Sequence, residues 1–398
     1  MQRVAELLDA VVRPLEKEIV CLDDACGRFV ARDILAPCSL PAIDEALRDG
    51  FAIRGKGERR GQQLCYPVVG EIAAGDLNVD RLKNDRAARI FTGAPVPDGT
   101  DRIVSQEHCR QIGTIVEIPS DVVLTAKTYI RRRGSELASG TLLVKRGECL
   151  RPHHLGVLAT AGLARLELFR RPLVACYSTG SELVSVGSST QPGQKISSNC
   201  LFLRHRLAQY GGRVVDYGLI EDKREALGMR LQDAVKRGVD LVVTTGGMGP
   251  GKYDLVAEDF LRAGGTIRCT ILPIRPGKSI LVGTLGATLL LALPGPPTAV
   301  EVLADVLAGP VLYGMQGKQT PWPQPVEVTM ATTICHSRPS GIDQLRPALC
   351  VLASGTCRLR TVTGPEESAN CFLLFPGKKA ELLQEELATV YFPPCDVC

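Results

Sequence analysis

The sequence predicts a multidomain α/β protein in which a doubly wound parallel sheet is accompanied by β-rich domains. Strand and helix patterns alternate from residue 170 to 317, as they do in parallel sheets covered by helices on both faces. Short β-type runs separated by Gly and Pro fill residues 43–129, and turn-separated strands return in residues 318–398. A chain of 398 residues exceeds one ordinary hydrophobic core, so several domains are expected.

The first part of the chain is predicted to contain one domain inserted into another. Residues 1–42 and 130–169 carry helical periodicity, and we expect them to form one helical or mixed linking domain. The β-rich domain of residues 43–129 is inserted between them, with strands in the runs FAIRG, YPVVGEIAAG, RIFTGAPVPDG and GTIVEIP.

The doubly wound domain is predicted to occupy residues 170–317. Its strands are expected in PLVACYS, RVVDYGLI, DLVVTT, residues 267–272 and TLLLAL. Its helices are expected at residues 199–210, from an N-cap at Asp222 to near Gly238, at residues 255–262 and from about Thr298. Residues 318–398 are expected to form a small β domain.

Three unusual turns follow strands of this domain, with the sequences STGSE (178–182), GGMGPGKYD (246–254) and LPGPP (293–297). Parallel strands bring such turns to one edge of the sheet, where ligands of these folds bind. The Gly-rich turn indicates an anion site, because glycine lets backbone N–H groups approach a ligand closely. Tyr253 disfavours a Walker nucleotide site and Lys252 disfavours a dinucleotide fingerprint. A turn that holds no ligand is the alternative interpretation.

Composition excludes several classes of function. A net charge of +4 is too small for this length to indicate a nucleic-acid-binding surface. The three arginines at residues 131–133 are expected to lie in a solvated turn. Charges near the N-terminus exclude a secretory signal, and no charge-free window of membrane-spanning length occurs, so a cytoplasmic protein is expected. Fifteen scattered cysteines indicate reduced thiols, and Cys395 with Cys398 is weak evidence for zinc.

A series of short motifs runs through nearly the whole chain. In order they are DGFA (49–52), TGAP (92–95), STGSEL (178–183), SN (198–199), TGG (245–247), Asp254, PGK (276–278) and LPG (293–295), with LR (345–346) and SAN (368–370) in the tail. This series resembles the molybdopterin molybdenumtransferases, the MoeA family related to the C-terminal domain of gephyrin. The resemblance implies four subdomains, a small C-terminal β-barrel, and a homodimer whose cleft lies between the doubly wound domain of one subunit and the β-rich domain of the other.

The resemblance also implies an activity and its site. Such enzymes take adenylylated molybdopterin (molybdopterin-AMP) and molybdate, insert the metal at the dithiolene sulfurs and release AMP, assisted by a divalent cation such as Mg²⁺. Carried over by position, the molybdopterin-binding residues are Thr179, Gly180, Glu182, Ser198, Asn199, Gly246, Gly247, Arg275, Pro294, Gly295 and Pro297. The catalytic set is Asp49, Thr92, Glu136, Asp254 and Lys278, and the metal ligands are Asp49 and Asp254. Arg275 and Lys278 are the cations that face phosphate or oxyanion.

Several positions depart from the family pattern. Arg48 stands beside Asp49, and we expect this cation to hold the carboxylate ionised and to compete with a metal for it. The other departures are Gly249 for a serine, Lys252 for an acid, Ala257 for a lysine, Glu136 for an aspartate, Ser279 for a proline and Pro296 for an asparagine. Three hypotheses follow: a working insertase, a paralogue that binds molybdopterin or a related nucleotide without inserting metal, and an unrelated hydrolase on the same fold.

Overall fold

The computed structural model describes residues 2–125, 128–220, 226–247, 255–335, 341–353, 356–362 and 367–394. The chain forms two compact units. The larger unit contains Met1–Arg32, Lys145–Leu155 and Arg165–Cys398, and the smaller unit contains Asp33–Val144 and Gly156–Ala164.

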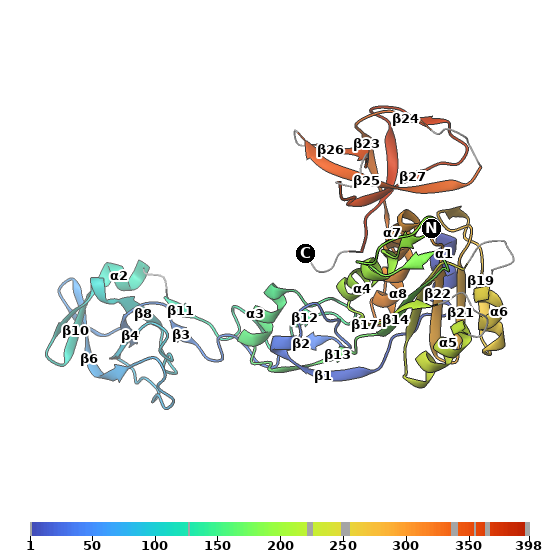
Figure 1. Ribbon diagram of the computed structural model, residues 1–398. Coiled ribbons are helices and arrows are strands. Elements are labelled where there is room, and N and C mark those ends of the chain that lie inside the picture. The colour runs from blue at the N-terminus through green and yellow to red at the C-terminus, as the bar shows by residue number, and fades with distance from the viewer. Residues whose placement is uncertain are drawn as a thin grey trace. The chain divides into compact units, whose positions relative to one another are not determined.

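A six-stranded sheet forms the centre of the doubly wound domain, in the order β17-β14-β18-β22-β21-β19 (Figure 1). In chain order its strands are β14 (Leu173–Thr179), β17 (Arg213–Ile220), β18 (Leu241–Thr245), β19 (Thr266–Cys269), β21 (Leu281–Leu285) and β22 (Thr288–Leu293). The predicted parallel pairing is confirmed for β17, β14, β18 and β22.

The sequence pattern does not predict β21, which runs antiparallel to both β22 and β19. Only Gly286 and Ala287 separate it from β22. A two-residue loop containing glycine makes a hairpin, whereas a parallel crossover needs about a dozen residues or more. The antiparallel direction of β21 therefore follows from the shortness of this connection.

Helices cover both faces of the sheet, which confirms the doubly wound arrangement. They are α4 (Asn199–Gln209), α5 (Ala226–Lys236), α6 (Leu255–Arg262), α7 (Pro297–Leu303) and α8 (Gly309–Met315), the last two joined by the π-helical segment Ala304–Ala308. Successive side chains of a strand point to opposite faces. Val174 and Cys176 accordingly pack in one core with α4, α7 and α8, whereas Ala175 and Tyr177 pack in a second core with α5 and α6.

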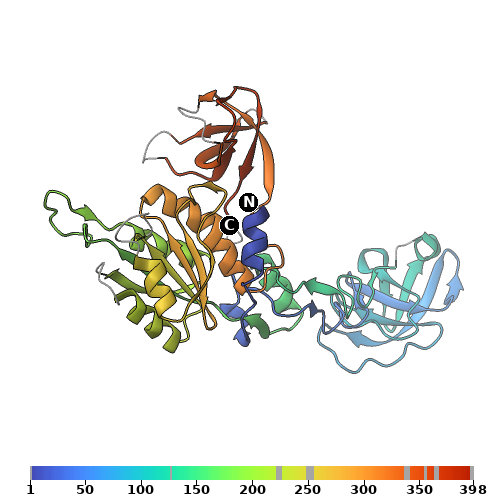
Figure 2. The ribbon, with the colours of Figure 1, turned by 90° about the vertical axis from the view of Figure 1, so that its right-hand side faces the viewer.

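The segment Pro297–Met315 is continuous, and within the described ranges it is the one helix long and apolar enough to span a membrane. However, 89% of its apolar window is buried inside the protein. Its Asp305 carboxylate accepts hydrogen bonds from Arg206 Nε at 2.5 Å and from Tyr210 Oη at 2.7 Å. Helix α1 (Gln2–Asp9) lies beside this segment and shares its core (Figure 2). The segment is thus the core helix of this domain.

The C-terminal segment folds into a closed barrel, which confirms the expected small β-barrel. Its strands are β23 (Pro325–Met330), β25 (Asp343–Ala353), β26 (Thr356–Thr361), β27 (Cys371–Phe375) and β29 (Leu387–Tyr391). They pair in the order β25-β26-β23-β29-β27, and β27 closes the barrel by pairing with β25. The short strand β20 (Ile274–Arg275) adds to β25 from outside the barrel, and β24 (Ile334–Cys335) pairs with β28 (Glu381–Leu382).

The predicted helical periodicity of the two flanking segments is wrong over much of their length. Short strands occur there instead: β1 (Lys17–Cys21) pairs with β13 (Arg165–Phe169), and β2 (Ile34–Leu35) pairs with β12 (Leu142–Val144). Helical structure is found in α1, in a 3-10 turn at Leu22–Asp24 and in α3 (Pro152–Thr160). Apolar runs of five residues or fewer do not distinguish the helical period from the strand period, so the presence of a pairing partner decides whether such a run forms a strand.

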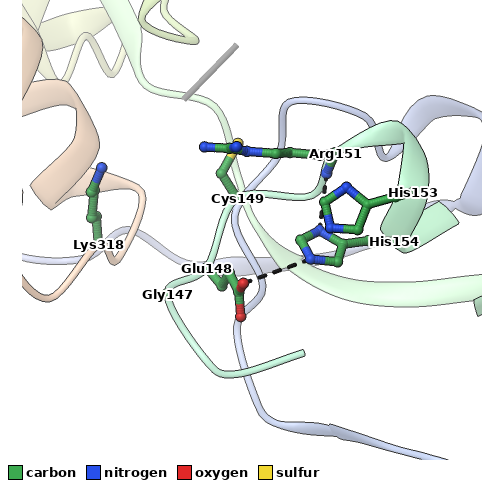
Figure 3. A pocket seen from close by; sticks show the side chains of 7 residues that line it. All are labelled: Gly147, Glu148, Cys149, Arg151, His153, His154 and Lys318. Atoms are coloured by element: carbon green, nitrogen blue, oxygen red, sulfur yellow. Dashed lines mark hydrogen bonds and ion pairs between the residues drawn. The ribbon is translucent and has the colours of Figure 1, made fainter. Parts of the chain in front are cut away.

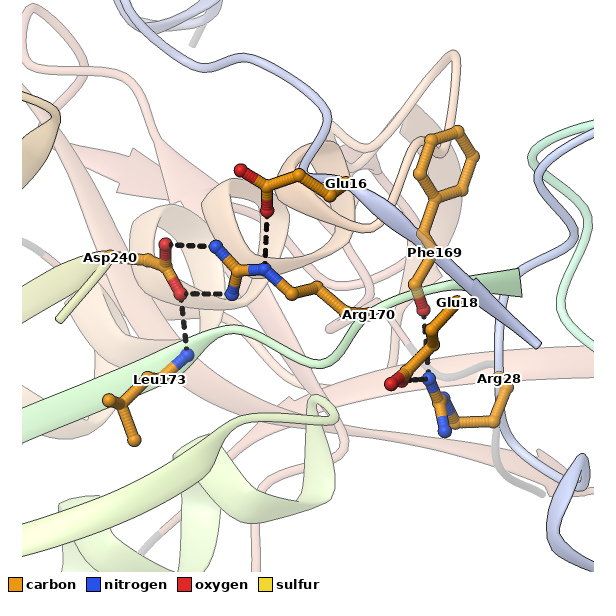
Figure 4. Close-up of polar contacts among 7 residues, drawn as sticks. All are labelled: Glu16, Glu18, Arg28, Phe169, Arg170, Leu173 and Asp240. Atoms are coloured by element: carbon orange, nitrogen blue, oxygen red, sulfur yellow. Dashed lines mark hydrogen bonds and ion pairs between the residues drawn. The ribbon is translucent and has the colours of Figure 1, made fainter. Parts of the chain in front are cut away.

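Ion pairs within the larger unit join the chain near β1 and β13 to the doubly wound sheet (Figure 4). The Arg170 guanidinium donates to both carboxylate oxygens of Asp240, at 2.6 and 2.8 Å, and to Glu16 at 2.5 Å. Asp240 also accepts the backbone N–H of Leu173 at 2.7 Å. These bonds raise the pKa of Arg170 above its ordinary range. The Arg170 guanidinium therefore binds Glu16, which lies 154 positions earlier in the chain, and Asp240, which lies 70 positions later.

The smaller unit contains a sheet in the order β8-β4-β7-β6-β10-β9, with β5 paired to β6. Its strands are β4 (Gly50–Arg54), β5 (Glu58–Arg60), β6 (Gln63–Ile72), β7 (Arg86–Ile90), β8 (Arg102–Ser105), β9 (Arg110–Ile112) and β10 (Ile115–Pro119). Its other elements are the pair β3 (Glu45–Ala46) and β11 (Ile130–Arg131), the pair β2 and β12, a 3-10 turn at Gln106–His108, α2 (Ser120–Thr125) and the later part of α3. Strands occur in all four runs predicted as β structure.

Candidate functional site

The carboxyl ends of β14, β18 and β22 meet at one edge of the doubly wound sheet. Ser178 of β14 pairs with Thr245 of β18, and Thr245 pairs with Leu293 of β22. The turns that follow these residues are therefore neighbours, as expected for parallel strands. We call this edge the strand-end site.

A chain of hydrogen bonds ties the three turns together. Ser178 Oγ and Thr245 Oγ1 lie 2.9 Å apart in the core, and the Asn199 side-chain amide at the start of α4 reaches Thr245 Oγ1 at 3.3 Å. The same amide donates to the backbone carbonyl of Gly295 at 2.9 Å. Ser178 Oγ also lies 3.2 Å from Cys200 Sγ. The predicted binding set leaves out Ser178, Thr245 and Cys200, although Ser178 and Thr245 belong to the STGSEL and TGG motifs.

Two glycines allow the Gly-rich turn to lie against β14. Gly246 has φ +90°, and a Cβ added to it would come within 2.1 Å of the Thr179 carbonyl oxygen. Gly247 has φ +65°, and its added Cβ would lie 3.0 Å from Thr179 Oγ1. The Gly246 N–H donates to the Leu293 carbonyl at 3.1 Å. Both the backbone conformation and the close approach therefore require glycine here.

The Thr179 hydroxyl is buried beside these glycines and has no hydrogen-bond partner in the part of the chain that the structure describes. The residue is only 7% exposed. Leaving a buried hydroxyl unpaired costs about 1–3 kcal/mol, so such groups call for an explanation. A ligand with hydrogen-bonding atoms that docks on the turn would supply the missing partner.

The remaining predicted binding residues lie in the segments next to this edge, except for Arg275. Gly180 passes close to the Glu182 carboxylate, because an added Cβ would lie 2.9 Å from Glu182 Oε2. Ser198 is exposed immediately before α4, and Pro294, Gly295 and Pro297 connect β22 to α7. Arg275 lies in β20, where it pairs with Gln344 of the barrel strand β25.

The antiparallel direction of β21 places Lys278 at the strand-end site. Leu281, the first residue of β21, pairs with Ala292 near the end of β22. An antiparallel strand begins at the edge where its neighbour ends. The loop with the exposed Lys278 therefore leads into β21 at the edge where β22 ends. A cation at this edge suits a phosphate or oxyanion ligand.

In the smaller unit, the structure joins two of the predicted catalytic residues directly. The backbone N–H and the hydroxyl of Thr92 donate to Asp49 Oδ1 at 2.8 and 2.7 Å. These two bonds lower the pKa of the Asp49 carboxyl, and the charge of Arg89 lowers it further. The expectation that Arg48 holds Asp49 ionised is wrong, because Thr92 and Arg89 are the residues that lower this pKa, while the Arg48 guanidinium lies over the Tyr129 ring, 5.3 Å from its centroid.

Glu136 lies in an ion pair within the same unit. Arg131 Nη1 is 2.8 Å from Glu136 Oε1, and Arg132 Nη1 is 2.6 Å from Asp44 Oδ2. The arginine run is therefore partly neutralised instead of simply solvated. Strand β11, which contains Arg131, pairs with β3 just ahead of Asp49.

Of the two predicted metal ligands, Asp49 lies in the described part of the chain and Asp254 does not. Asp254, Gly249, Lys252 and the pair Cys395 and Cys398 lie outside the described residues. Within the described ranges no group of three or more His, Cys, Asp or Glu is arranged to hold a metal ion. Mg²⁺ is often held by one or two carboxylates together with substrate phosphates, so the Asp49 carboxylate is chemically suited to bind it.

Comparison with known proteins covers nearly the whole chain. Residues 1–162 match the model of the MoeA N-terminal region (domain I and II), and residues 175–314 match a probable molybdopterin binding domain. A molybdopterin molybdenumtransferase 2 of Mycobacterium tuberculosis is 33% identical over 363 residues, which are 89% of this chain and 88% of that protein. A molybdopterin molybdenumtransferase of Haemophilus influenzae is 29% identical over 98% of this chain and 97% of that protein.

The fold agrees with a solved structure. A molybdopterin biosynthesis moea protein from Pyrococcus horikosii superposes with a TM-score of 0.83 and 24% identity, covering 98% of both chains. Together with the relatives above, the matched models show that the chain belongs to the molybdopterin molybdenumtransferases, the MoeA family of molybdenum cofactor biosynthesis.

Proposed function

We propose that this chain inserts molybdate into adenylylated molybdopterin and releases AMP. The observation that carries the proposal is the buried hydroxyl of Thr179, which has no hydrogen-bond partner among the described residues and lies against the close-packed glycines 246 and 247. A phosphate oxygen of the pterin substrate is an acceptor for this hydroxyl. Membership of the family supports the same class of substrate.

The residues of the strand-end site have different roles in substrate binding. The Asn199 amide holds the Gly295 turn and Thr245 at a fixed separation, so the site is organised before substrate arrives. Thr179 donates its hydroxyl to a phosphate oxygen. Lys278, at the same edge, balances the charge of the phosphoryl group or of molybdate while the anhydride to AMP is broken.

We further propose that the protein is a cytoplasmic homodimer in which Mg²⁺ assists. Asp49 is the carboxylate for the metal, because Thr92 keeps its pKa low and the side chain ionised. Mg²⁺ would supply charge neutralisation of the phosphates. The test is light scattering of the purified chain together with turnover; a monomer that turns over substrate at the normal rate contradicts the dimer.

The division into four domains, residues 1–42 with 130–169, 43–129, 170–317 and 318–398, is also kept as a proposal. Pairing of β1 with β13 and of β2 with β12 supports a domain built from two separated pieces of chain. Limited proteolysis with mass spectrometry tests it: cleavage should concentrate near residues 43, 130, 170 and 318.

Replacing Thr179 with valine tests the role of its hydroxyl. The variant should fold with unchanged or greater stability, because an unpaired buried hydroxyl is removed. Its affinity for adenylylated molybdopterin, measured by calorimetry, should fall by about 10- to 150-fold, the equivalent of one hydrogen bond to a charged group.

Thr244 provides a matched control. Its hydroxyl is also buried without a partner among the described residues, but alternation along β18 places it on the opposite face from Thr245. Thr244→Val should therefore match Thr179→Val in stability and match the unmodified protein in affinity. Equal affinity of all three proteins would refute the assignment of Thr179 to the substrate.

A second experiment separates an insertase from a binding paralogue. The substitutions Gly249→Ser, Lys252→Asp and Ala257→Lys restore the family pattern, and AMP release and metal incorporation are followed across a magnesium titration. We expect the unmodified chain to be slow, and the restored variant to be faster and more dependent on magnesium. A fast unmodified chain with a slower restored variant would exclude the binding-only alternative.

A further inference from the structure

A separate cavity of about 390 Å³ opens in the larger unit, away from the turns of the strand-end site. It is lined by Gly147, Glu148, Cys149, Arg151, His153, His154 and Lys318 (Figure 3). These residues come from the turn after β12, from the first turn of α3 and from the turn after α8. Its size falls within the range of small-molecule sites, roughly 300–1,000 Å³.

Positive groups dominate the walls of this cavity. Arg151 and Lys318 line two of its sides, and the ring of His153 packs against that of His154 with centroids 3.9 Å apart (Figure 3). Glu148 is the one carboxylate among the described lining residues, and it has partners. Its Oε1 lies 3.6 Å from His154 Nε2, and its Oε2 accepts the Lys145 N–H at 3.2 Å. The described lining therefore carries two cationic side chains, Arg151 and Lys318, against one carboxylate.

The walls are held in place by the backbone. An added Cβ on Gly147 would lie 2.5 Å from the Gly317 carbonyl oxygen, so the two turns are in direct contact. The Gly147 N–H donates to the Val30 carbonyl at 2.7 Å, and the Lys318 ammonium lies 5.0 Å from the centre of the Tyr313 ring. The cations are consequently presented by a preformed frame, which reduces the entropy lost on binding.

The histidine pair is arranged to respond to an anion. His154 Nδ1 accepts the Arg151 N–H at 3.1 Å, which leaves Nε2 to carry the proton toward Glu148. Burial and the neighbouring His153 lower the pKa of His154, while Glu148 opposes this and Arg151 adds to it. A bound anion would favour the protonated ring, so it should raise this pKa.

We propose that this cavity is a second anion site, which binds a tetrahedral oxyanion or the phosphate group of a small phosphomonoester. Arginine and lysine together are the side chains that recognise such groups, arginine with paired donors and lysine as a compact charge. The site is independent of the strand-end site, since it shares no lining residue with the three turns. The inference does not depend on the proposed insertase activity.

Histidine NMR tests the site directly in the full-length protein. Inorganic phosphate, molybdate and AMP are titrated separately, and the imidazole signals of His153 and His154 are assigned by single substitution to glutamine. We expect these signals to shift with saturation, and the pKa of His154 to rise. The comparison of the three probes separates a free oxyanion from a phosphomonoester as the ligand. Unmoved signals up to millimolar concentrations of every probe would overturn the proposal.

Charge substitutions provide the complementary measurement. Lys318→Gln and Arg151→Gln should each weaken the binding of the preferred probe by about tenfold, the effect of one charge-assisted hydrogen bond. Glu148→Gln should strengthen it severalfold, because a repelling carboxylate is removed. A weaker site in Glu148→Gln would contradict the charge argument. All variants are made also with Thr179→Val, so that anion binding at the strand-end site is distinguished from binding in this cavity.

Discussion

Replacing Gly246 with alanine should damage both folding and substrate binding. The residue has φ +90°, a conformation that costs an L-amino acid about 1–2 kcal/mol. Its new Cβ would also lie 2.1 Å from the Thr179 carbonyl oxygen, and relieving such an overlap costs about 1–3 kcal/mol more. The sum is a loss of roughly 2–5 kcal/mol in the stability of the doubly wound domain.

Gly193 offers a control in which only the first of these effects operates. It too has φ +90°, but an added Cβ meets nothing within 4 Å. It occupies the third position of an exposed turn in which the Gln194 N–H bonds the Gln191 carbonyl. Gly193→Ala should therefore lose about 1–2 kcal/mol and keep its affinity for substrate.

Thermal denaturation and calorimetry with adenylylated molybdopterin provide the comparison. The Tm of Gly246→Ala should lie roughly 2–12 °C below that of Gly193→Ala, from about 2–4 °C per kcal/mol in a domain of this size. Binding should be lost only in Gly246→Ala, because relief of the overlap displaces the turn from Thr179. Equal Tm values with equal affinities would refute the claim that close approach, and not backbone conformation alone, requires glycine at this position.

Two further predictions concern charged groups. Thr92→Val removes one of two hydrogen bonds to Asp49, so the pKa of that carboxyl should rise toward its ordinary value in a ¹³C NMR titration. The folded-state pKa of Asp49 is the lower one, so the small contribution of this carboxylate to stability is present above its ordinary pKa and is lost as pH falls through the folded-state pKa. An unchanged titration would show that the Thr92 backbone bond alone is enough to lower the pKa. Arg170→Ala leaves the Asp240 carboxylate nearly buried without its cation and should lower the free energy of unfolding by about 3–5 kcal/mol in chemical denaturation. A loss below about 1 kcal/mol would mean that the pair behaves as a surface ion pair.

The sequence alone was sufficient for most elements of the doubly wound domain, although not for the antiparallel strand β21. Runs such as DLVVTT and TLLLAL are long, apolar and bounded by turn residues, so their type is unambiguous, and parallel pairing follows from the helices between them. The meeting of the STGSE, GGMGPGKYD and LPGPP turns was predictable for the same reason. Family motifs supplied the class of substrate, and matched family models and relatives confirm that membership.

Only the tertiary structure decided which side chains of that edge lack partners and which cations reach it. Thr179 and Thr245 are both threonines at strand ends. Within the described residues Thr245 is hydrogen-bonded, by Ser178 and Asn199, whereas the Thr179 hydroxyl has no partner. The pattern likewise put Arg48 beside Asp49, whereas packing turned its guanidinium onto Tyr129.

The sequence by itself determined most elements of the doubly wound domain, the parallel direction of its predicted strands and the family. The three-dimensional packing decided the strand order, the antiparallel strand β21, the strands of the flanking segments and the hydrogen bonds of the sites. Periodicity reports which face of an element is buried, and it is a local property of the chain. Contacts such as that of Gly317 with the turn at Gly147, or of Arg170 with Asp240, join residues far apart in sequence. Their geometry depends on how whole elements pack, which no local pattern contains.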